Sequence, residues 1–138
     1  DFLFAAIVGW NQDGHGFIDT AIENGATTIL CSSMPAQVKQ RVTYVLVENT
    51  SEALALMAAS FFNHPSAHVK LVGVTGTNGK TTIATLLYQL FTALGYKCGL
   101  LSTVNNIVGA EVLHSDFTTP DAISLNALMR QMVDAGCT

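Results

Sequence analysis

A glycine-rich segment that ends in a lysine is the part of the sequence best suited to chemistry. It reads Thr75-Gly76-Thr77-Asn78-Gly79-Lys80-Thr81. Glycine lets the backbone turn so that several amide N–H groups point inward, and a helix that follows adds the positive end of its dipole. This arrangement is typical of a loop that binds phosphates. In such a loop Lys80 would bring its charge to the terminal phosphates, and the Thr81 hydroxyl would bind Mg²⁺.

The surrounding sequence supports a phosphate loop, although the general pattern G-x-x-x-x-G-K-T would need glycine where Val74 stands. The apolar run 69–74 predicts a strand before the loop, and the apolar spacing over 81–94 predicts a helix after it. Between Glu52 and Glu111 the sequence holds no acidic residue and three lysines. An anion would meet little repulsion there. The alternative, a structural glycine turn with a surface lysine, is therefore disfavoured.

The elements that would position this loop follow from the spacing of apolar residues. Strands are predicted over 2–8, 27–31, 44–47, 69–74 and 98–103, and helices over 17–24, 51–62, 81–94 and from Pro120 onward. Residues 105–118 are expected to be irregular or a small hairpin. The helix over 81–94 is expected to turn one face inward, formed by Leu86, Leu87, Leu90, Phe91 and Leu94.

Helix starts are predicted from polar residues and proline. Thr50 or Ser51 is expected to cap the helix that precedes residue 63. Thr119 is expected to cap the last helix, with Pro120 at its first position.

The order strand, glycine loop, helix, strand over 69–103 predicts the crossover of a parallel sheet. Pro65 ends the preceding helix and marks a candidate domain boundary. The predicted fold class is α/β. We expect a small N-terminal α/β domain over 1–66, followed over 67–138 by the start of a P-loop-type parallel-sheet ATPase domain.

Composition excludes several classes of protein. The chain has 138 residues, of which 49% are hydrophobic and 12% charged, as in a packed globular protein. A net charge of −4 argues against binding to nucleic acid, and no apolar run is long enough for membrane insertion. Three cysteines without paired spacing are expected to be reduced core residues. With no leader segment before Asp1, these features predict a cytoplasmic protein.

Several segments resemble the Mur ligases, bacterial enzymes that add amino acids to the peptidoglycan precursor. Residues 73–82 resemble the ATP loop of this family, and Thr-Thr-Pro-Asp at 118–121 resembles a motif of its MurE branch. Residues 3–6, the loop 9–14 and residues 17–26 are similar to the N-terminal domain of that branch. The resemblance covers nearly the whole chain in the right order.

The resemblance implies an ATP-dependent ligase of peptidoglycan precursor synthesis. Such an enzyme adds meso-diaminopimelate or L-lysine to UDP-N-acetylmuramoyl-L-alanyl-D-glutamate through an acyl phosphate. Its cofactors would be ATP and Mg²⁺, and its partners a UDP-N-acetylmuramoyl peptide and an amino acid. The metal-binding glutamate, the carbamylated lysine and the C-terminal domain of the family would lie beyond Thr138. The 138 residues are thus expected to be a fragment that is inactive alone.

The resemblance also implies roles for particular residues. ATP would be bound by Gly76, Thr77, Asn78, Gly79, Lys80, Thr81 and Thr82. Among these, Lys80 would be catalytic and Thr81 would bind the metal. The UDP-muramoyl peptide would be contacted by Thr118, Thr119, Trp10 and Asn11. Trp10 and Asn11 stand where many members of the branch place His-Gln or similar polar residues.

Three other functions compete with this interpretation. A MurF-type ligase, which adds D-alanyl-D-alanine, has a similar first domain and ATP loop, and Val104-Asn105-Asn106 faintly resembles its asparagine pair. A P-loop switch or kinase would use the nucleotide without forming an amide, but no guanine-reading motif or activation signature is present. A non-catalytic nucleotide-binding module is the third. The Thr-Thr-Pro-Asp motif favours the MurE branch, and the sequence predicts no particular oligomeric state.

Overall fold

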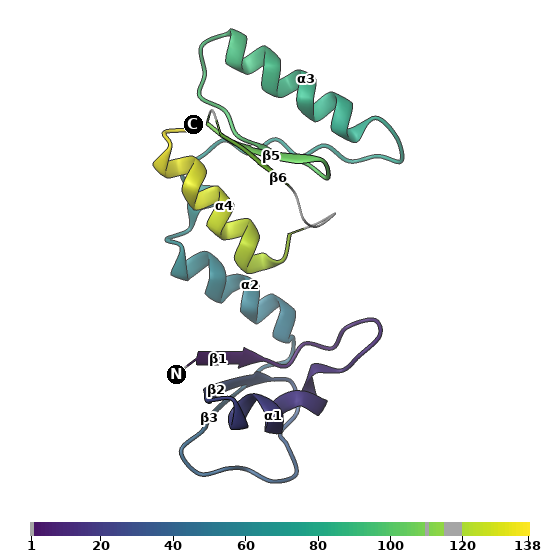
Figure 1. Cartoon of the computed structure of the whole chain (residues 1–138), viewed down its shortest axis with the longest axis vertical. Helices are drawn as coiled ribbons and strands as arrows, with labels where there is room; N and C mark the ends of the chain where they lie inside the picture. The colour runs from purple at the N-terminus through teal and green to yellow at the C-terminus, as the bar shows by residue number, and fades with distance from the viewer. Residues whose placement is uncertain (1, 110, 115–119) are drawn as a thin grey trace. The chain divides into compact units, whose positions relative to one another are not determined.

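The computed structural model describes residues 2–109, 111–114 and 120–138. Its elements follow in the order β1 (Phe2–Ala5), η1 (Gly14–Phe17), α1 (Ile18–Glu23), β2 (Ala26–Cys31), β3 (Thr43–Leu46), α2 (Thr50–Phe61), η2 (Pro65–Ala67), α3 (Lys80–Ala93), β4 (Leu100–Leu101), β5 (Asn105–Val108), β6 (Glu111–His114) and α4 (Ala122–Asp134) (Figure 1). They form two compact units, Asp1–Met57 and Ala58–Thr138.

A parallel sheet with the order β1-β2-β3 forms the first unit. β2 lies in the middle, and its Ile29, Leu30 and Cys31 are fully buried. Buried Ile18 and Ala21 of α1 pack into the same cluster. Strands covered in this way carry nearly continuous apolar runs, which is why the sequence reveals them clearly. The predicted α/β class is confirmed.

The first strand is shorter than the predicted 2–8. β1 ends at Ala5, and Val8 forms an isolated bridge with Asp13 instead of extending the parallel ladder. Residues 8–13 form a turn, which is closed by a hydrogen bond from Gly14 N–H to the Ile7 carbonyl at 2.8 Å. The apolar run therefore continues past the end of the strand.

The start of α2 corrects one prediction. Asn49, rather than Thr50 or Ser51, caps this helix. Its Oδ1 accepts the backbone N–H groups of Ser51 at 3.0 Å and Glu52 at 3.1 Å. Asparagine is as good a cap as serine, so the cap preference alone could not separate neighbouring candidates.

An antiparallel sheet, β4-β5-β6, lies between α3 and α4 in the second unit (Figure 1). Its core contains Val108 with Met132 and Cys137. The hairpin expected within 105–118 is confirmed by β5 and β6, whose register pairs Ile107 with Val112. Residues 110 and 115–119 are not among those described.

Two predicted strands of the second unit differ from the structure. Residues 69–74 form no strand, and Leu71 and Val72 in this run are exposed. The strand predicted over 98–103 is reduced to β4, which pairs antiparallel with β5. A parallel crossover needs a ladder between these two segments, and the described residues of this unit contain only the antiparallel sheet.

The predicted inward face of α3 is also wrong. The helix forms close to the predicted bounds and is followed by Gly95 at a φ of 90°. None of its residues is buried, and Leu86, Leu90 and Leu94 are more than half exposed. The apolar spacing is present, but no parallel sheet covers that face within the described residues.

The start of α4 corrects the last cap prediction. Asp121 is the N-cap, and Pro120 precedes the helix instead of occupying its first position. Asp121 accepts the backbone N–H of Ser124 at 2.8 Å, which satisfies an amide that lacks a partner inside the helix. Thr119, the predicted cap, lies outside the described residues.

Among residues 2–109, 111–114 and 120–138, every helix is too short or too polar to cross a bilayer. All three cysteines are free thiols. Cys31 and Cys137 are buried as predicted, whereas Cys98 is only half-buried.

Candidate functional site

The predicted phosphate loop lies directly before α3. Gly76 has a φ of 148° and Gly79 a φ of 79°, both in the region that favours glycine. Gly79 is the N-cap of α3, so Lys80, Thr81 and Thr82 make up the first turn of the helix. The structure thus brings all the predicted ATP-binding positions, 76–82, into one loop and helix start.

Lys80 folds back over this loop. Its Nζ donates to the Gly76 carbonyl at 2.5 Å and lies 3.4 Å from the Thr77 carbonyl. The side chain spans the loop from the helix to the first glycine, and the residue is exposed. The ammonium is therefore held at the open side of the loop, where it can exchange a carbonyl for a phosphate oxygen.

The donors at this place fit a phosphate group. The first amides of a helix lack intrahelical partners, and the first turn of α3 holds no acidic residue. A charged lysine beside such amides offers both a point charge and directed N–H groups. The open space around a Cβ built on Gly79 leaves room for a ligand at the helix start.

A metal ion finds fewer ligands. Thr81 is half-buried in the first turn and offers one hydroxyl. Within the part of the chain that the structure describes, no three His, Cys, Asp or Glu side chains gather closely enough to hold a metal. The chemistry of the donor set thus fits a Mg²⁺ that is held mainly by phosphates, with Thr81 as a single protein ligand.

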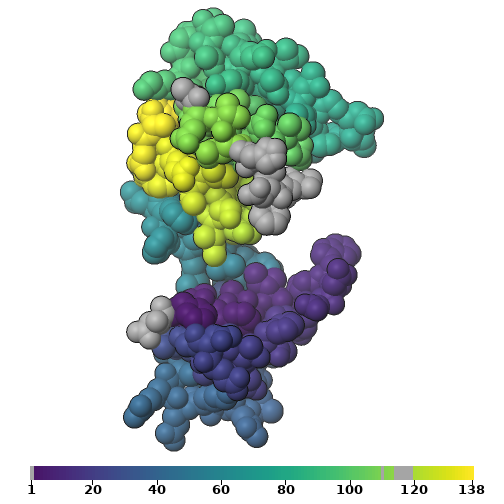
Figure 2. All heavy atoms as spheres, in the orientation of Figure 1, coloured from purple at the N-terminus to yellow at the C-terminus, as the bar shows by residue number. Residues whose placement is uncertain are grey.

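Trp10 and Asn11 lie on the turn between β1 and η1. Gly9 N–H donates to the Gln12 carbonyl at 2.9 Å, which closes the turn. Trp10 is fully exposed, and Asn11 is exposed beside it. Figure 2 shows this segment, in dark purple, standing out from the rest of the first unit. An exposed indole with a neighbouring amide can stack on a planar ring and bind its polar edge.

The other two residues predicted to bind the substrate, Thr118 and Thr119, lie outside the described residues. Their roles stay predictions.

The contacts of His15 with Asp13 and Ser32 could not be predicted from the sequence. His15 has no histidine or cysteine at metal-ligand spacing and was given no role. In the structure its Nδ1 lies 2.6 Å from Asp13 Oδ1, and its Nε2 accepts the backbone N–H of Ser32 at 3.0 Å. The available signal was the carboxylate two residues before the imidazole, in the sequence Asp13-Gly14-His15.

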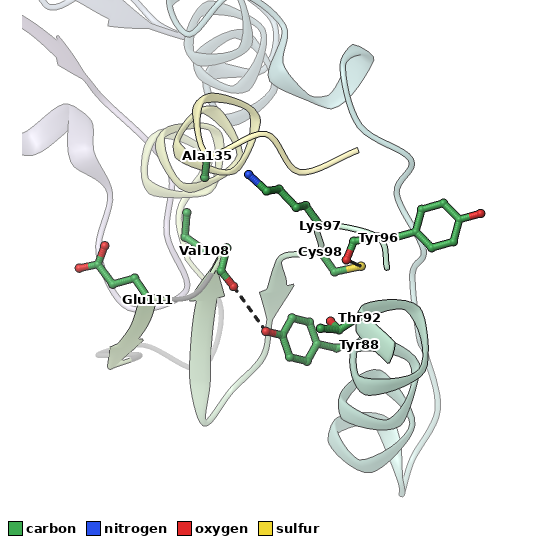
Figure 3. A pocket seen from close by; sticks show the side chains of 9 residues that line it. Tyr88, Thr92, Tyr96, Lys97, Cys98, Val108, Glu111 and Ala135 are labelled. Carbon is green, nitrogen blue, oxygen red and sulfur yellow. Dashed lines mark hydrogen bonds between the residues drawn. The ribbon is translucent and has the colours of Figure 1, made fainter. Parts of the chain in front are cut away.

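A pocket of about 470 Å³ lies in the second unit, between α3, β5 and the end of α4 (Figure 3). Tyr88 donates to the Gly109 carbonyl at 3.4 Å inside it. Lys97 and Glu111 are its charged lining residues. None of the predicted site residues lines this pocket.

Two family models match the sequence. The model described as "Mur ligase family, catalytic domain" matches residues 1–62, and the one described as "Mur ligase middle domain" matches residues 74–138. Both models thus belong to the same family and follow in order along the chain.

Known proteins of this kind are close in sequence. UDP-N-acetylmuramoyl-L-alanyl-D-glutamate--2,6-diaminopimelate ligase of Cytophaga hutchinsonii is 52% identical over 137 residues, which is 99% of this chain. The ligase of the same name from Bacteroides fragilis is 50% identical over 135 residues, or 98% of the chain. The chain spans 28% of the length of each of these curated relatives.

Solved structures agree with these matches. MurF ligase from Thermotoga maritima in complex with ADP is similar with a TM-score of 0.57 and 28% identity, over 92% of this chain and 25% of that one. MurF from Acinetobacter baumannii, at 18% identity and a TM-score of 0.51 over 94% of this chain and 24% of that one, shares the fold. With two successive Mur ligase models, close relatives and a similar solved fold, the chain belongs to the Mur ligase family.

Proposed function

We propose that the full-length protein carrying this chain is the MurE-type ligase of peptidoglycan precursor synthesis. It would add a diamino acid, meso-diaminopimelate or L-lysine, to UDP-N-acetylmuramoyl-L-alanyl-D-glutamate with ATP. The observation that carries the proposal is the glycine loop that Lys80 closes by its hydrogen bond to the Gly76 carbonyl. The chain that holds this loop is 50–52% identical in sequence to diaminopimelate ligases. Since the chain spans 28% of those relatives, the activity belongs to the whole protein.

The loop would hold ATP by its triphosphate. The backbone amides from Gly76 to Thr82 surround the phosphates, and Lys80 moves from the Gly76 carbonyl to a terminal phosphate oxygen. Thr81 would offer its hydroxyl to the Mg²⁺ that accompanies the nucleotide. This ion neutralises phosphate charge when bound, and the loop positions the phosphoryl group for in-line attack.

The chemistry follows from the weakness of a carboxylate as an electrophile. An oxygen of the D-glutamate side-chain carboxylate attacks the terminal phosphorus of ATP, and ADP leaves, which gives an acyl phosphate. The amine of the diamino acid then attacks the acyl carbon, loses a proton and expels phosphate as the amide forms. The Lys80 charge stabilises the negative charge that develops during the first step.

The remaining assignments complete this proposal. Trp10 and Asn11 would contact the UDP part of the substrate, because both are exposed on one projecting turn. Thr118 and Thr119 would contact the muramoyl peptide. For the proposed domain limits 1–66 and 67–138, the family models that end at 62 and begin at 74 give support, whereas the first compact unit already ends at Met57. A cytoplasmic location agrees with three free cysteines and with the use of ATP.

The test measures ADP release by the full-length protein with ATP, Mg²⁺, UDP-N-acetylmuramoyl-L-alanyl-D-glutamate and meso-diaminopimelate or L-lysine. We expect release that requires the UDP substrate and an amide product seen by mass spectrometry. Lys80→Ala should lower the rate at least about a hundredfold, as for loss of a main electrostatic group. Lys70→Ala, at another exposed lysine, is the control. Normal turnover in Lys80→Ala would contradict the proposal.

A MurF-type ligase is the second candidate, because two solved structures similar to this chain are MurF enzymes. The same assay separates the two. With the UDP-muramoyl tripeptide and D-alanyl-D-alanine, a MurF-type enzyme forms product, whereas a MurE-type enzyme stays inactive. Nucleotide binding without turnover on either set of substrates would instead indicate a binding module.

A further inference from the structure

His15 joins two segments of the first unit that are far apart in sequence. On one side its Nδ1 lies 2.6 Å from Asp13 Oδ1, next to the projecting turn. On the other, its Nε2 lies 3.0 Å from Ser32 N and 3.3 Å from Ser33 N, just after β2. The imidazole side chain is only 13% exposed. One side chain therefore ties the turn between β1 and η1 to the carboxyl end of the central strand.

These contacts fix the protonation of the ring. Backbone N–H groups only donate, so the Nε2 that faces Ser32 and Ser33 must carry a lone pair. Nδ1 then carries the ring proton, and its N–H donates a hydrogen bond to Asp13 Oδ1. Hydrogen bonds from His15 hold the pKa of the Asp13 carboxyl below its ordinary value, so this acceptor stays charged. The network needs a neutral imidazole in one tautomer.

The same three residue types occur in hydrolase triads, but this network is not built as one. Ser32 Oγ lies 3.2 Å from Nε2, farther than the backbone N–H of the same residue at 3.0 Å. A general base must keep its lone pair for the hydroxyl proton, and here two amides already share it. The arrangement therefore holds the chain in place rather than activating the serine.

The segment that His15 holds is the turn with Trp10 and Asn11. The Val8–Asp13 bridge closes this turn at its base, and Asp13 is also the residue that His15 contacts. We propose that His15, as a neutral imidazole, is a positioning residue that locks this turn to the end of β2 and so presents Trp10 and Asn11 to the uracil nucleotide of the substrate. This inference rests on the proposed function.

Protonation should open the lock. An imidazolium carries N–H at Nε2 and would face the donors of Ser32 and Ser33. Among the described residues, Asp13 is the one charged side chain in contact with His15, and the segment after β2 contributes two amides and a hydroxyl. Protonation of the ring should therefore weaken binding of the nucleotide.

The binding test uses the full-length protein and uridine 5′-diphosphate as the probe, with Kd measured by calorimetry. His15→Ala should weaken binding about tenfold, as for one or two lost hydrogen bonds. Ser32→Ala is the matched control, because it keeps both backbone amides and should change Kd less than about twofold. His15→Gln is the conservative variant. Its amide oxygen reaches the place of Nε2 and can accept the same backbone N–H groups, so it should restore binding.

A second readout follows the lock itself. Amide hydrogen exchange of the peptide holding Ser32 and Ser33 should be faster in His15→Ala than in wild type and Ser32→Ala at the same pH. Unchanged exchange, or a Kd in His15→Ala equal to that of wild type, would overturn the inference. A wild-type protein that does not bind uridine 5′-diphosphate would overturn the proposed function itself. Circular dichroism of each variant confirms that it is folded.

Discussion

Lys80 Nζ donates to the carbonyl oxygen of Gly76 across 2.5 Å, which closes the phosphate loop on its own main chain. In the proposed complex a phosphate oxygen would replace that carbonyl, so binding would depend on how firmly the backbone of the loop keeps its shape. The shape is set by the glycines, since both Gly76 and Gly79 have a positive φ that other residues adopt at a cost.

Gly79→Ala should therefore weaken ATP binding. At a φ of 79° an alanine is strained by about 1 kcal/mol, even though no atom lies within 4 Å of its Cβ. Part of that strain would be released by moving the loop, which displaces the amides at the start of α3. Calorimetry on the full-length protein measures the ATP affinity. Gly73→Ala is the matched control, because Gly73 also has free space and no positive φ. Equal affinities in the two variants would contradict this reasoning.

Gly14→Ala should destabilise the first unit for a different reason. A Cβ on Gly14 would lie 2.7 Å from Ile7 N and 2.8 Å from Ile7 O, and the backbone would have to move. We expect a loss of about 1–3 kcal/mol in the free energy of unfolding, as for overpacking. Urea unfolding followed by circular dichroism measures it. Gly16→Ala, with nothing within 4 Å, should be nearly neutral, and the idea fails if both variants behave alike.

The sequence predicts the strands of the first unit better than those of the second because β2 has a strand on each side. β2 is buried on both faces, so Ile29 and Leu30 stand in a continuous apolar run that indicates a strand by itself. The run over 69–74 is equally apolar, yet Leu71 and Val72 are exposed. A strand forms only where a neighbouring strand accepts its backbone hydrogen bonds. The apolar residues of a segment such as 69–74 do not show whether that neighbour is present.

The phosphate loop and the His15 contacts also differ in how far apart their residues lie in the sequence. The proposed phosphate loop can be recognised in the sequence because its glycines and Lys80 are adjacent in the chain. The contact between His15 and Ser32 joins residues 17 positions apart, and only the fold brings them together. The cap of α2 was predicted at the wrong residue because Asn49, Thr50 and Ser51 stand in a row and each is a residue type that can accept the first amides of a helix, although Asn49 alone does so among the described contacts.

Asp121→Ala should destabilise α4. The Asp121 carboxylate accepts Ser124 N–H at 2.8 Å and faces the Ser124 hydroxyl at 3.2 Å. Loss of such a cap costs about 1 kcal/mol, and asparagine can replace aspartate. Asp121→Asn should thus stay near wild type in urea unfolding, and Ser124→Ala should lose less than Asp121→Ala because its backbone N–H remains. A stable Asp121→Ala variant would show that the cap is not needed.

Acid should weaken the first unit through Asp13. The His15 backbone N–H donates to Asp13 Oδ1 at 2.9 Å, and this bond, with the one from the imidazole, holds the pKa of the carboxyl below its ordinary value of 3.8. A group with a lowered pKa in the folded state contributes stability above its unfolded pKa and loses it as the pH falls through the folded one. Wild type should therefore lose stability as the pH falls below about 4.

Asp13→Asn separates this contribution from general acid unfolding. Asparagine keeps an acceptor for the His15 backbone N–H but cannot be protonated in this range, so the variant should start with lower stability at pH 7 and lose less of it on acidification. Thermal unfolding of the full-length protein at pH 7 and at pH 3, followed by circular dichroism, gives the two slopes. Parallel loss of stability in wild type and Asp13→Asn would mean that the carboxylate of Asp13 does not support the turn between β1 and η1.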